Sequence, residues 1–217
     1  MKNYIFKTSL FLIGFSMLMG CDLTNDFLGS EDLVTIERDL NSFQNIIAGE
    51  NITVKITQGP IQQILATTNT NMTENLITKV EDNTLKISLK NGSYKNSTFI
   101  LDIQIPDLKK LKFKDAAEGE LFMISDMLSI EMQDASKLNL NGNSSILNIE
   151  LSDASKLFGF GFLANTANVS LKDASKLEIE VLDILQGKAS DAAKIIYKGN
   201  PIIDINTKDA AKVIKEN

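Results

Sequence analysis

A four-residue motif that starts with an aspartate carries most of the side chains in this sequence that could do chemistry. It reads Asp-Ala-Ser-Lys at residues 134–137, and successive acids are separated by 19, 19, 20, 18 and 18 residues. The six acids are Asp115, Asp134, Asp153, Asp173, Asp191 and Asp209. Rows of carboxylates can bind Ca²⁺, and a serine near acidic and basic groups can act as a nucleophile. A metal site and a catalytic site are therefore the two chemistries to test.

The small residues of the motif argue against catalysis. The position after the acid is always alanine, at Ala116, Ala135, Ala154, Ala174, Ala192 and Ala210. The next position holds serine in three copies and alanine in three, so it selects a small volume and not a hydroxyl. The chain has no histidine that could activate a serine. We expect a structural corner, with no catalytic residue and no cofactor.

Charge is also arranged regularly around the motif. A lysine follows the acid by three residues in every copy but the first, which has Glu118; these lysines are Lys137, Lys156, Lys176, Lys194 and Lys212. We expect the acids to accept backbone N–H bonds at a tight corner and the lysines to form a parallel basic ladder that offsets repulsion between stacked acids. A row of Ca²⁺ ions along the acids is the alternative. The adjacent lysines and the absence of a glycine-rich calcium repeat disfavour it, so we expect no metal site.

Apolar residues alternate on both sides of the motif, which indicates a strand entering and a strand leaving each corner. Ile149 and Leu151 stand four and two residues before Asp153, and Leu157 stands four after it. A unit of 18–20 residues cannot bury its inner face alone, but units stacked about 4.8 Å apart enclose a continuous core. The repeat therefore predicts an all-β fold, a parallel β-solenoid.

The residues before the repeat also read as strands, but without the acid-alanine corner. NITVKITQG at 51–59, NTLKISLKNG at 83–92 and STFILDIQIP at 97–106 all alternate and end in Gly, Pro or Asn. We expect these less regular strands to cap the N-terminal end of the solenoid. Residues 34–217 would then form a single domain.

The first twenty residues have Lys2 and Lys7 followed by a short apolar run, which is typical of an export signal. The run ends in LMGC and resembles a bacterial lipoprotein signal, so we expect cleavage before Cys21 and lipid on its thiol. Residues 21–33 would form an acidic tether to an outer membrane, on its periplasmic or exterior side. Loss of the two lysines changes the net charge from −6 to −8, which argues against nucleic acid as a partner.

One stretch, LFGFGFL at 157–163, departs from the repeat. If the alternation of the neighbouring coils continues, Phe158, Phe160 and Phe162 point outward together and form a candidate binding patch for a protein or a glycan. The alternative, which we favour, is that a bulge or a shifted register turns the rings into the core or under a loop.

Taken together, these motifs resemble the auto-transporter adhesin head GIN domain family of Bacteroidetes lipoproteins. The resemblance covers residues 34–217 and rests on NITVKITQG, NTLKISL, IPDLKKLKF, the small-residue corners and the closing YKGNP. It implies a right-handed parallel β-helix on an exported protein, with no shared catalytic residues. We expect a lipid-anchored adhesion or surface scaffold module. The alternative is a lipoprotein that binds a glycan or small ligand through its aromatic patch.

Overall fold

The structure is a computed structural model, and it describes residues 25–216. Within this range the protein is built of strands, apart from one three-residue 3-10 turn at Thr70–Met72. No helix there has the length or apolar character needed to cross a bilayer. The predicted all-β fold is confirmed.

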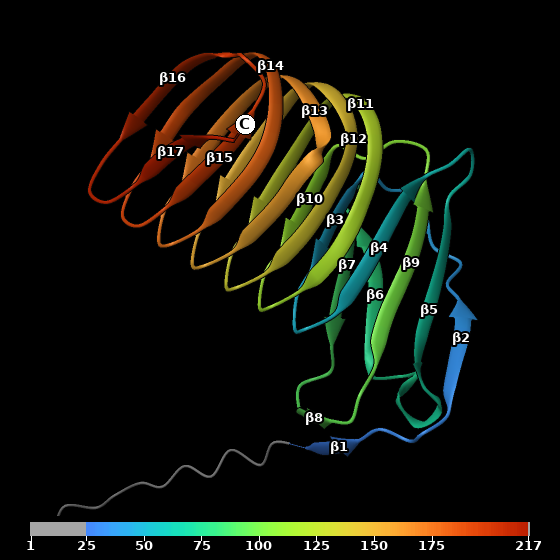
Figure 1. Cartoon of the computed structure of the whole chain (residues 1–217). Coiled ribbons are helices and arrows are strands. Elements are labelled where there is room, and N and C mark those ends of the chain that lie inside the picture. The colour runs from blue at the N-terminus through green and yellow to red at the C-terminus, as the bar shows by residue number, and fades with distance from the viewer. Residues whose placement is uncertain (1–24, 217) are drawn as a thin grey trace, which may run out of the picture.

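The second half of the described chain is a parallel β-solenoid, seen side-on in Figure 1. Its coils are formed by strands that pair in parallel with the strands before and after them. These strands are β10 (Lys110–Phe113), β11 (Glu118–Met132), β12 (Lys137–Leu151), β13 (Lys156–Leu171), β14 (Lys176–Ala189), β15 (Lys194–Lys198), β16 (Ile202–Thr207) and β17 (Lys212–Lys215). The right-handed winding stays a prediction.

Each full coil is one long bent strand with two arms. The first arm of β14 pairs with β15, and its second arm pairs with β16, so the two arms belong to different faces of the solenoid. The motif corner then joins the second arm of one coil to the first arm of the next. Inward side chains such as Leu138, Leu157 and Leu177 stack in register and are fully buried, which gives the coils the common core that no single coil has.

The solenoid begins earlier than its sequence motif. Strands β3 (Asn45–Ala48) and β4 (Thr53–Gln58) pair in parallel with β10 and with the first arm of β11. The corner between them, Glu50–Asn51, has φ values of 60° and 59°, like the later corners. Residues 59–109 follow this first coil before the regular stack continues at β10.

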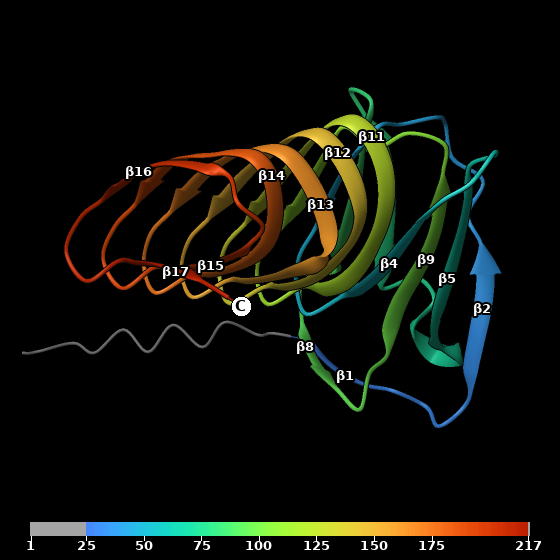
Figure 2. The same ribbon diagram turned by 45° about the horizontal axis from the view of Figure 1, so that its top comes forward.

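A set of mixed strands closes the N-terminal end, as the sequence predicts. Strands β7 (Thr84–Leu89) and β9 (Phe99–Ile105) pair in parallel with β3 and β4. Next to them, β6 (Leu76–Glu81) and β5 (Gln63–Asn69) run antiparallel, and β2 (Leu33–Glu37) is antiparallel to β5. Figure 2 shows these strands standing at one end of the coils. These antiparallel strands end the parallel stack, so they form a cap at its N-terminal end.

The described part of the expected tether is ordered against the cap. Strand β1 (Asp26–Leu28) pairs in parallel with β8 (Ser93–Lys95). Asn69 donates its side-chain amide to the Ser30 carbonyl at 2.6 Å, and the Ser30 N–H is donated to the Asn71 side chain at 3.0 Å. Residues 26–33 thus belong structurally to the domain and not to a solvated linker.

At the opposite end, the last coil lacks such a cover. Strand β16 pairs only with β14, and β17 only with β15, within residues 25–216. Ile202 and Ile203 are 71% and 40% exposed there. The two ends of the solenoid are therefore different.

Candidate functional site

The motif corner is a tight turn in which both central residues are left-handed. Asp134 and Ala135 have φ values of 54° and 59°, and the Ser136 N–H is donated to the Gln133 carbonyl at 3.3 Å. Positive φ at both central positions is the pattern of a type I′ turn. Aspartate tolerates this region better than most residues other than glycine, so the backbone itself favours the acid of the motif.

Backbone hydrogen bonds link these corners from coil to coil. The Ala116 N–H is donated to the Asp134 carbonyl and the Ala135 N–H to the Asp153 carbonyl, both at 2.8 Å. The Ala154 N–H continues the series to the Asp173 carbonyl at 2.9 Å. The predicted stacking of these aspartates in register along one edge is thereby confirmed.

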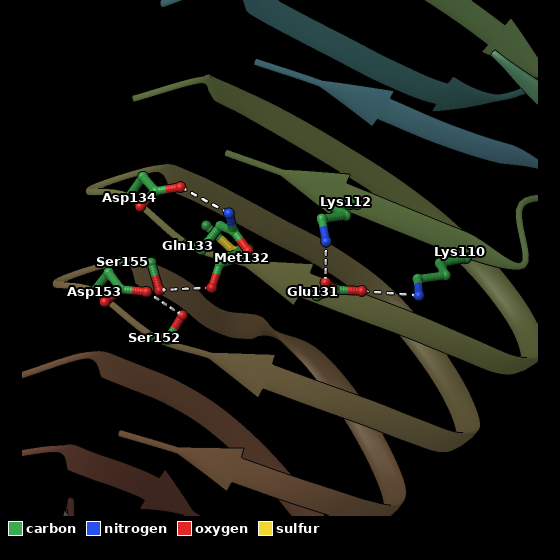
Figure 3. Close-up of polar contacts among 9 residues, drawn as sticks. All are labelled: Lys110, Lys112, Glu131, Met132, Gln133, Asp134, Ser152, Asp153 and Ser155. Carbon is green, nitrogen blue, oxygen red and sulfur yellow. Dashed lines mark hydrogen bonds and ion pairs between the residues drawn. The ribbon is translucent and has the colours of Figure 1, made fainter. Parts of the chain in front are cut away.

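The carboxylates bind the side chain just before them. In Figure 3, Gln133 donates its side-chain amide to Asp134 Oδ2 at 2.8 Å, and the Ser152 hydroxyl is 2.6 Å from Asp153 Oδ2. Lys114 and Lys172 form ion pairs with the acids that follow them, at 2.9 and 3.2 Å. Among the hydrogen bonds of residues 25–216, none runs from a backbone N–H to a corner carboxylate. The expectation that these acids cap backbone N–H groups is therefore wrong.

The two small positions of the motif differ in burial. The alanine after the acid is exposed in all six copies, so volume does not restrict it. The next residue is buried in the copies at Ala117, Ser136, Ser155, Ser175 and Ala193. There the Ser155 hydroxyl is donated to the Met132 carbonyl at 3.2 Å (Figure 3). Small volume is required at this third position, and the left-handed backbone constrains the second.

The motif lysines form a column, because each pairs in register with the next along the first arms. Lys137 lies 2.5 Å from Glu118, and Lys176 lies 2.7 Å from Glu178. Within the described chain, no motif lysine forms an ion pair with the acid of its own corner. Two of the acids, Asp115 and Asp173, are instead paired with the lysine just before them. The carboxylate of Asp173, followed by those of Asp153 and Asp191, raises the pKa of Lys172.

The three phenylalanines do not share one face. Phe162 is 1% exposed and lies in the core, while Phe158 and Phe160 are half-buried. A bulge in β13 causes this, since residues 160–162 have no partner in β14. A Cβ at Gly161 would lie 2.1 Å from Asn141 Oδ1, so a larger residue at the bulge would displace the exposed Asn141 side chain. The alternative with a shifted register is confirmed for Phe162.

The two outer rings each lie beside a lysine. The Lys176 ammonium is 5.6 Å from the centre of the Phe158 ring, and the Lys198 ammonium is 4.4 Å from the centre of the Phe160 ring. Both distances suit cation–π attraction. What remains of the candidate patch is therefore two partly covered rings flanked by positive charge.

A second column, of amides, lies on the other arms of the coils. Asn168 donates to Asn148 Oδ1 and Gln186 donates to Asn168 Oδ1, both at 2.8 Å. Together with Asp204 these residues line a shallow depression of about 510 Å³. Each stands five residues before a motif acid, and that spacing is the signal in the sequence that could have revealed the column.

A neighbouring acid on this side is held by two lysines. Lys110 lies 2.8 Å from Glu131, and Lys112 contacts the other oxygen of the same carboxylate (Figure 3). Burial opposes ionisation of Glu131, but the hydrogen bonds and charges of the two lysines outweigh it and lower its pKa. Across residues 25–216, no three acidic, cysteine or histidine side chains come together as a metal site would need.

Cys21 and the predicted export signal lie outside the described residues. The lipid anchor therefore has no structural counterpart and stays a prediction.

The fold is shared with solved structures from Bacteroides and Parabacteroides species. A putative adhesin from Bacteroides fragilis superposes with a TM-score of 0.70 at 20% identity, over 88% of this chain and all of that one. A putative adhesin from Parabacteroides merdae gives 0.56 at 14% identity, over 89% of this chain and all of that one. A protein from Parabacteroides distasonis described as a putative lipid binding protein gives 0.54 at 14% identity, with the same coverage. At these identities the likeness shows the fold alone.

No curated protein matches the chain. A family model does match it, over residues 42–201, and this stretch includes the first coil, the cap strands β5–β9 and the corners from Asp115 to Asp191. The match covers most of the chain. The chain therefore belongs to the family described as putative auto-transporter adhesin, head GIN domain.

Proposed function

We propose that this protein is a non-catalytic, exported lipoprotein that serves as an adhesion or scaffold module of the cell envelope. The observation that carries the proposal is the surface of the stack, where like side chains repeat once per coil in columns. Such a surface offers a partner many weak and equivalent contacts along one line. It contrasts with the enclosed pocket and convergent polar groups that are usual in enzymes.

Family membership supports the same reading, since the family description names an adhesin. The corner supports it from another direction, because Ser155 and Ser175 donate their hydroxyls to backbone carbonyls and are withdrawn from solvent. The repeated Asp-Ala-Ser-Lys sequence thus serves the backbone of the turn. Its exposed charges remain available for a partner.

The anchor is tested through Cys21, the only cysteine in the chain. In Cys21→Ser we expect loss of labelling by a fatty-acid probe and release of the protein from the membrane fraction. Ser30→Ala, which leaves the cysteine intact, is the matched control and should behave as the native chain. Continued labelling of Cys21→Ser would refute lipid attachment at this residue.

The adhesive role is tested on cells. Cells that carry the native chain should attach to a partner surface, such as host matrix or neighbouring bacteria, more strongly than cells that lack it. Cells with Cys21→Ser should lose this attachment, because the module is no longer held at the envelope. Equal attachment by cells with and without the chain would contradict the proposal.

A second candidate is glycan binding at Phe158 and Phe160, each partly exposed beside a lysine. Aromatic rings can stack on sugars, and the lysines would favour an acidic sugar. A glycan array should then bind the native chain and lose signal with Phe158→Ala or Phe160→Ala. Phe122→Ala is the control, because Phe122 is 46% exposed and lies two coils away. No binding to any acidic glycan would exclude this candidate.

A further inference from the structure

Two columns of opposite charge run along the same edge of the solenoid. The acid column lies at the tips of the corners and comprises Asp115, Asp134, Asp153, Asp173, Asp191 and Asp209. The lysine column lies where the next strands begin and comprises Lys137, Lys156, Lys176, Lys194 and Lys212. Both columns advance by one coil at a time, which is about 4.8 Å. They are therefore commensurate from the corner at Asp134 to the one at Asp209, while the first copy has Glu118 in place of the lysine.

Several charges in each column have no opposite partner within the molecule. Asp153 and Asp191 bind only the neutral hydroxyls of Ser152 and Ser190, at 2.6 and 2.8 Å. Asp134 likewise binds the amide of Gln133. In the lysine column, Lys156, Lys194 and Lys212 form no ion pair with any residue of 25–216. These lysines and acids are at least partly exposed, so their charges face solvent.

We propose that this edge binds a second copy of the same chain, side by side and with the two solenoid axes parallel. A twofold axis parallel to the solenoid axis turns the two edges toward each other and keeps each residue at its own height. It places the acid column of each copy opposite the lysine column of the other, so the two copies make two equivalent sets of contacts. Asp153 of one copy then faces Lys156 of the other, and Asp191 faces Lys194.

The opposite orientation is disfavoured by the same geometry. A twofold axis perpendicular to the solenoid axis would bring acids opposite acids and lysines opposite lysines, so the columns would repel. Charge therefore selects the parallel pair, in which both cap ends lie on the same side. Two chains held on one membrane would also stand this way, although the inference does not depend on the anchor.

The neighbouring columns also argue against other occupants. A linear polyanion on the lysines would lie along the full length of the acid column, and a row of cations on the acids would lie along the lysines. Only a surface with both signs at the same repeat satisfies the two columns together. Exposed ion pairs are individually weak, so the pairing rests on their repetition and should be sensitive to salt.

The test uses the full chain extracted in mild detergent, with self-association measured by sedimentation equilibrium. We expect a dimer whose dissociation constant rises about tenfold or more between roughly 0.05 and 0.5 M NaCl, since salt screens exposed charges. A chain that stays monomeric at low salt and high concentration would overturn the proposal.

A charge swap tests the pairing itself. One variant combines Asp153→Lys with Asp191→Lys, and the other combines Lys156→Glu with Lys194→Glu. Each alone should weaken self-association at least tenfold, and an equal mixture should form a heterodimer with native affinity, because both columns pair again. Native self-association by either variant, or a mixture of folded variants that stays monomeric, would contradict the proposal.

Lysine at a left-handed corner can also harm the fold, so a milder pair keeps the test decisive. Asp153→Asn with Asp191→Asn retains a residue suited to positive φ and removes only the charge. Circular dichroism should show native folding, while the dimer weakens and loses much of its salt dependence. These readouts are independent of acylation and cell attachment, so their failure is distinct from failure of the proposed function.

Discussion

The stack and the cap solve the same packing problem with different sequences. In the stack, Leu138, Leu157 and Leu177 fill equivalent places in successive coils. In the cap, neighbouring strands change direction, and the aromatic rings of Phe27, Tyr94 and Phe99 pack together instead. Repetition in the sequence therefore follows repetition of the environment, and it disappears where a strand has unlike neighbours.

The tight corners make the comparison sharper, because they occur in both regions. Asp82 and Asn83 of the cap have φ values of 48° and 59°, close to those of Asp134 and Ala135 in the stack. The cap turn joins two antiparallel strands as a hairpin, whereas the stack turn leads from one coil to the next. The same turn conformation thus forms both a hairpin and a coil-to-coil connection, and the strands around it decide which of the two it forms.

The largest expected effect is in the shared core. Leu157→Ala, in the middle of the stack, should cost about 2–5 kcal/mol of unfolding free energy, since the side chain is fully buried. Because each coil contacts mainly its neighbours, hydrogen exchange should rise most in β12–β14. Leu101, in β9 of the cap, is also fully buried. In the counterpart variant Leu101→Ala, hydrogen exchange should rise most in the cap strands and less in β12–β14. Uniform exchange increases from both would show that stack and cap unfold together.

A second effect concerns the left-handed turns. Ala154→Val should lower the unfolding free energy by about 1–2 kcal/mol, because a β-branched residue is strained at a φ of 61°. Asn83→Val, at 59° in the cap, should cost a similar amount. Ala154→Gly is the control and should be neutral or stabilising. Denaturant unfolding compares them, and a harmless valine at either site would show that the turn has relaxed.

A smaller effect separates the buried serines of the stack. Ser155→Ala loses one hydrogen bond to the Met132 carbonyl, which still accepts the Ser152 N–H at 3.0 Å, so we expect a loss of at most about 1 kcal/mol. The Ser136 hydroxyl is buried without a partner in the described structure, so Ser136→Ala should be neutral or stabilising. Thermal unfolding of the two variants measures the difference. An opposite order would mean that Ser136 has a partner in solution.

The smallest effect is the dependence on pH. The lowered pKa of Glu131 means that its contribution to stability is present above the unfolded value of about 4.3 and is lost as the pH falls through the lower folded value. Glu131→Gln should therefore flatten the acid limb of a stability–pH curve. In the cap, hydrogen bonds and charges from Lys79 and Lys86 lower the pKa of Glu81 to about 2. The Glu81 side chain is more exposed than that of Glu131, so Glu81→Gln should change the curve less.

Much of the stack could be predicted from the sequence, because its signals recur with each coil. Alternation gave the inward residues, and the 18–20 residue spacing gave the corners and their register. The first corner, Glu50–Asn51, could not be predicted from the motif. It has φ values like those of the later corners, but it lacks their alanine and their spacing of 18–20 residues. Several pairs of residues can adopt the left-handed geometry of this turn, whereas the repeated motif contains only the pair Asp-Ala.

The details of the corner and the patch were harder to predict. Sequence alone does not distinguish an acid that binds backbone N–H groups from one that binds the preceding side chain, as Asp134 and Asp153 do. Nor does it separate the exposed Ala154 from the buried Ser155. At Phe162 the cause is a bulge, because one residue inserted relative to β12 shifts the alternation, so that Phe162 and Ala164 are buried where Leu157 and Gly159 were before it.

The different closure of the two ends has a mechanical consequence. The last coil is joined to the rest along one side only, through β14–β16 and β15–β17 pairing, while the first coil is covered by the cap. A force that pulls the C-terminal coil away along the solenoid axis would open its backbone bonds one after another, as in a zipper. Each coil of 18–20 residues would then yield about 60 Å of extended chain before the next one opens. Under tension the stack would lengthen in equal steps, with the cap as the last part to give way.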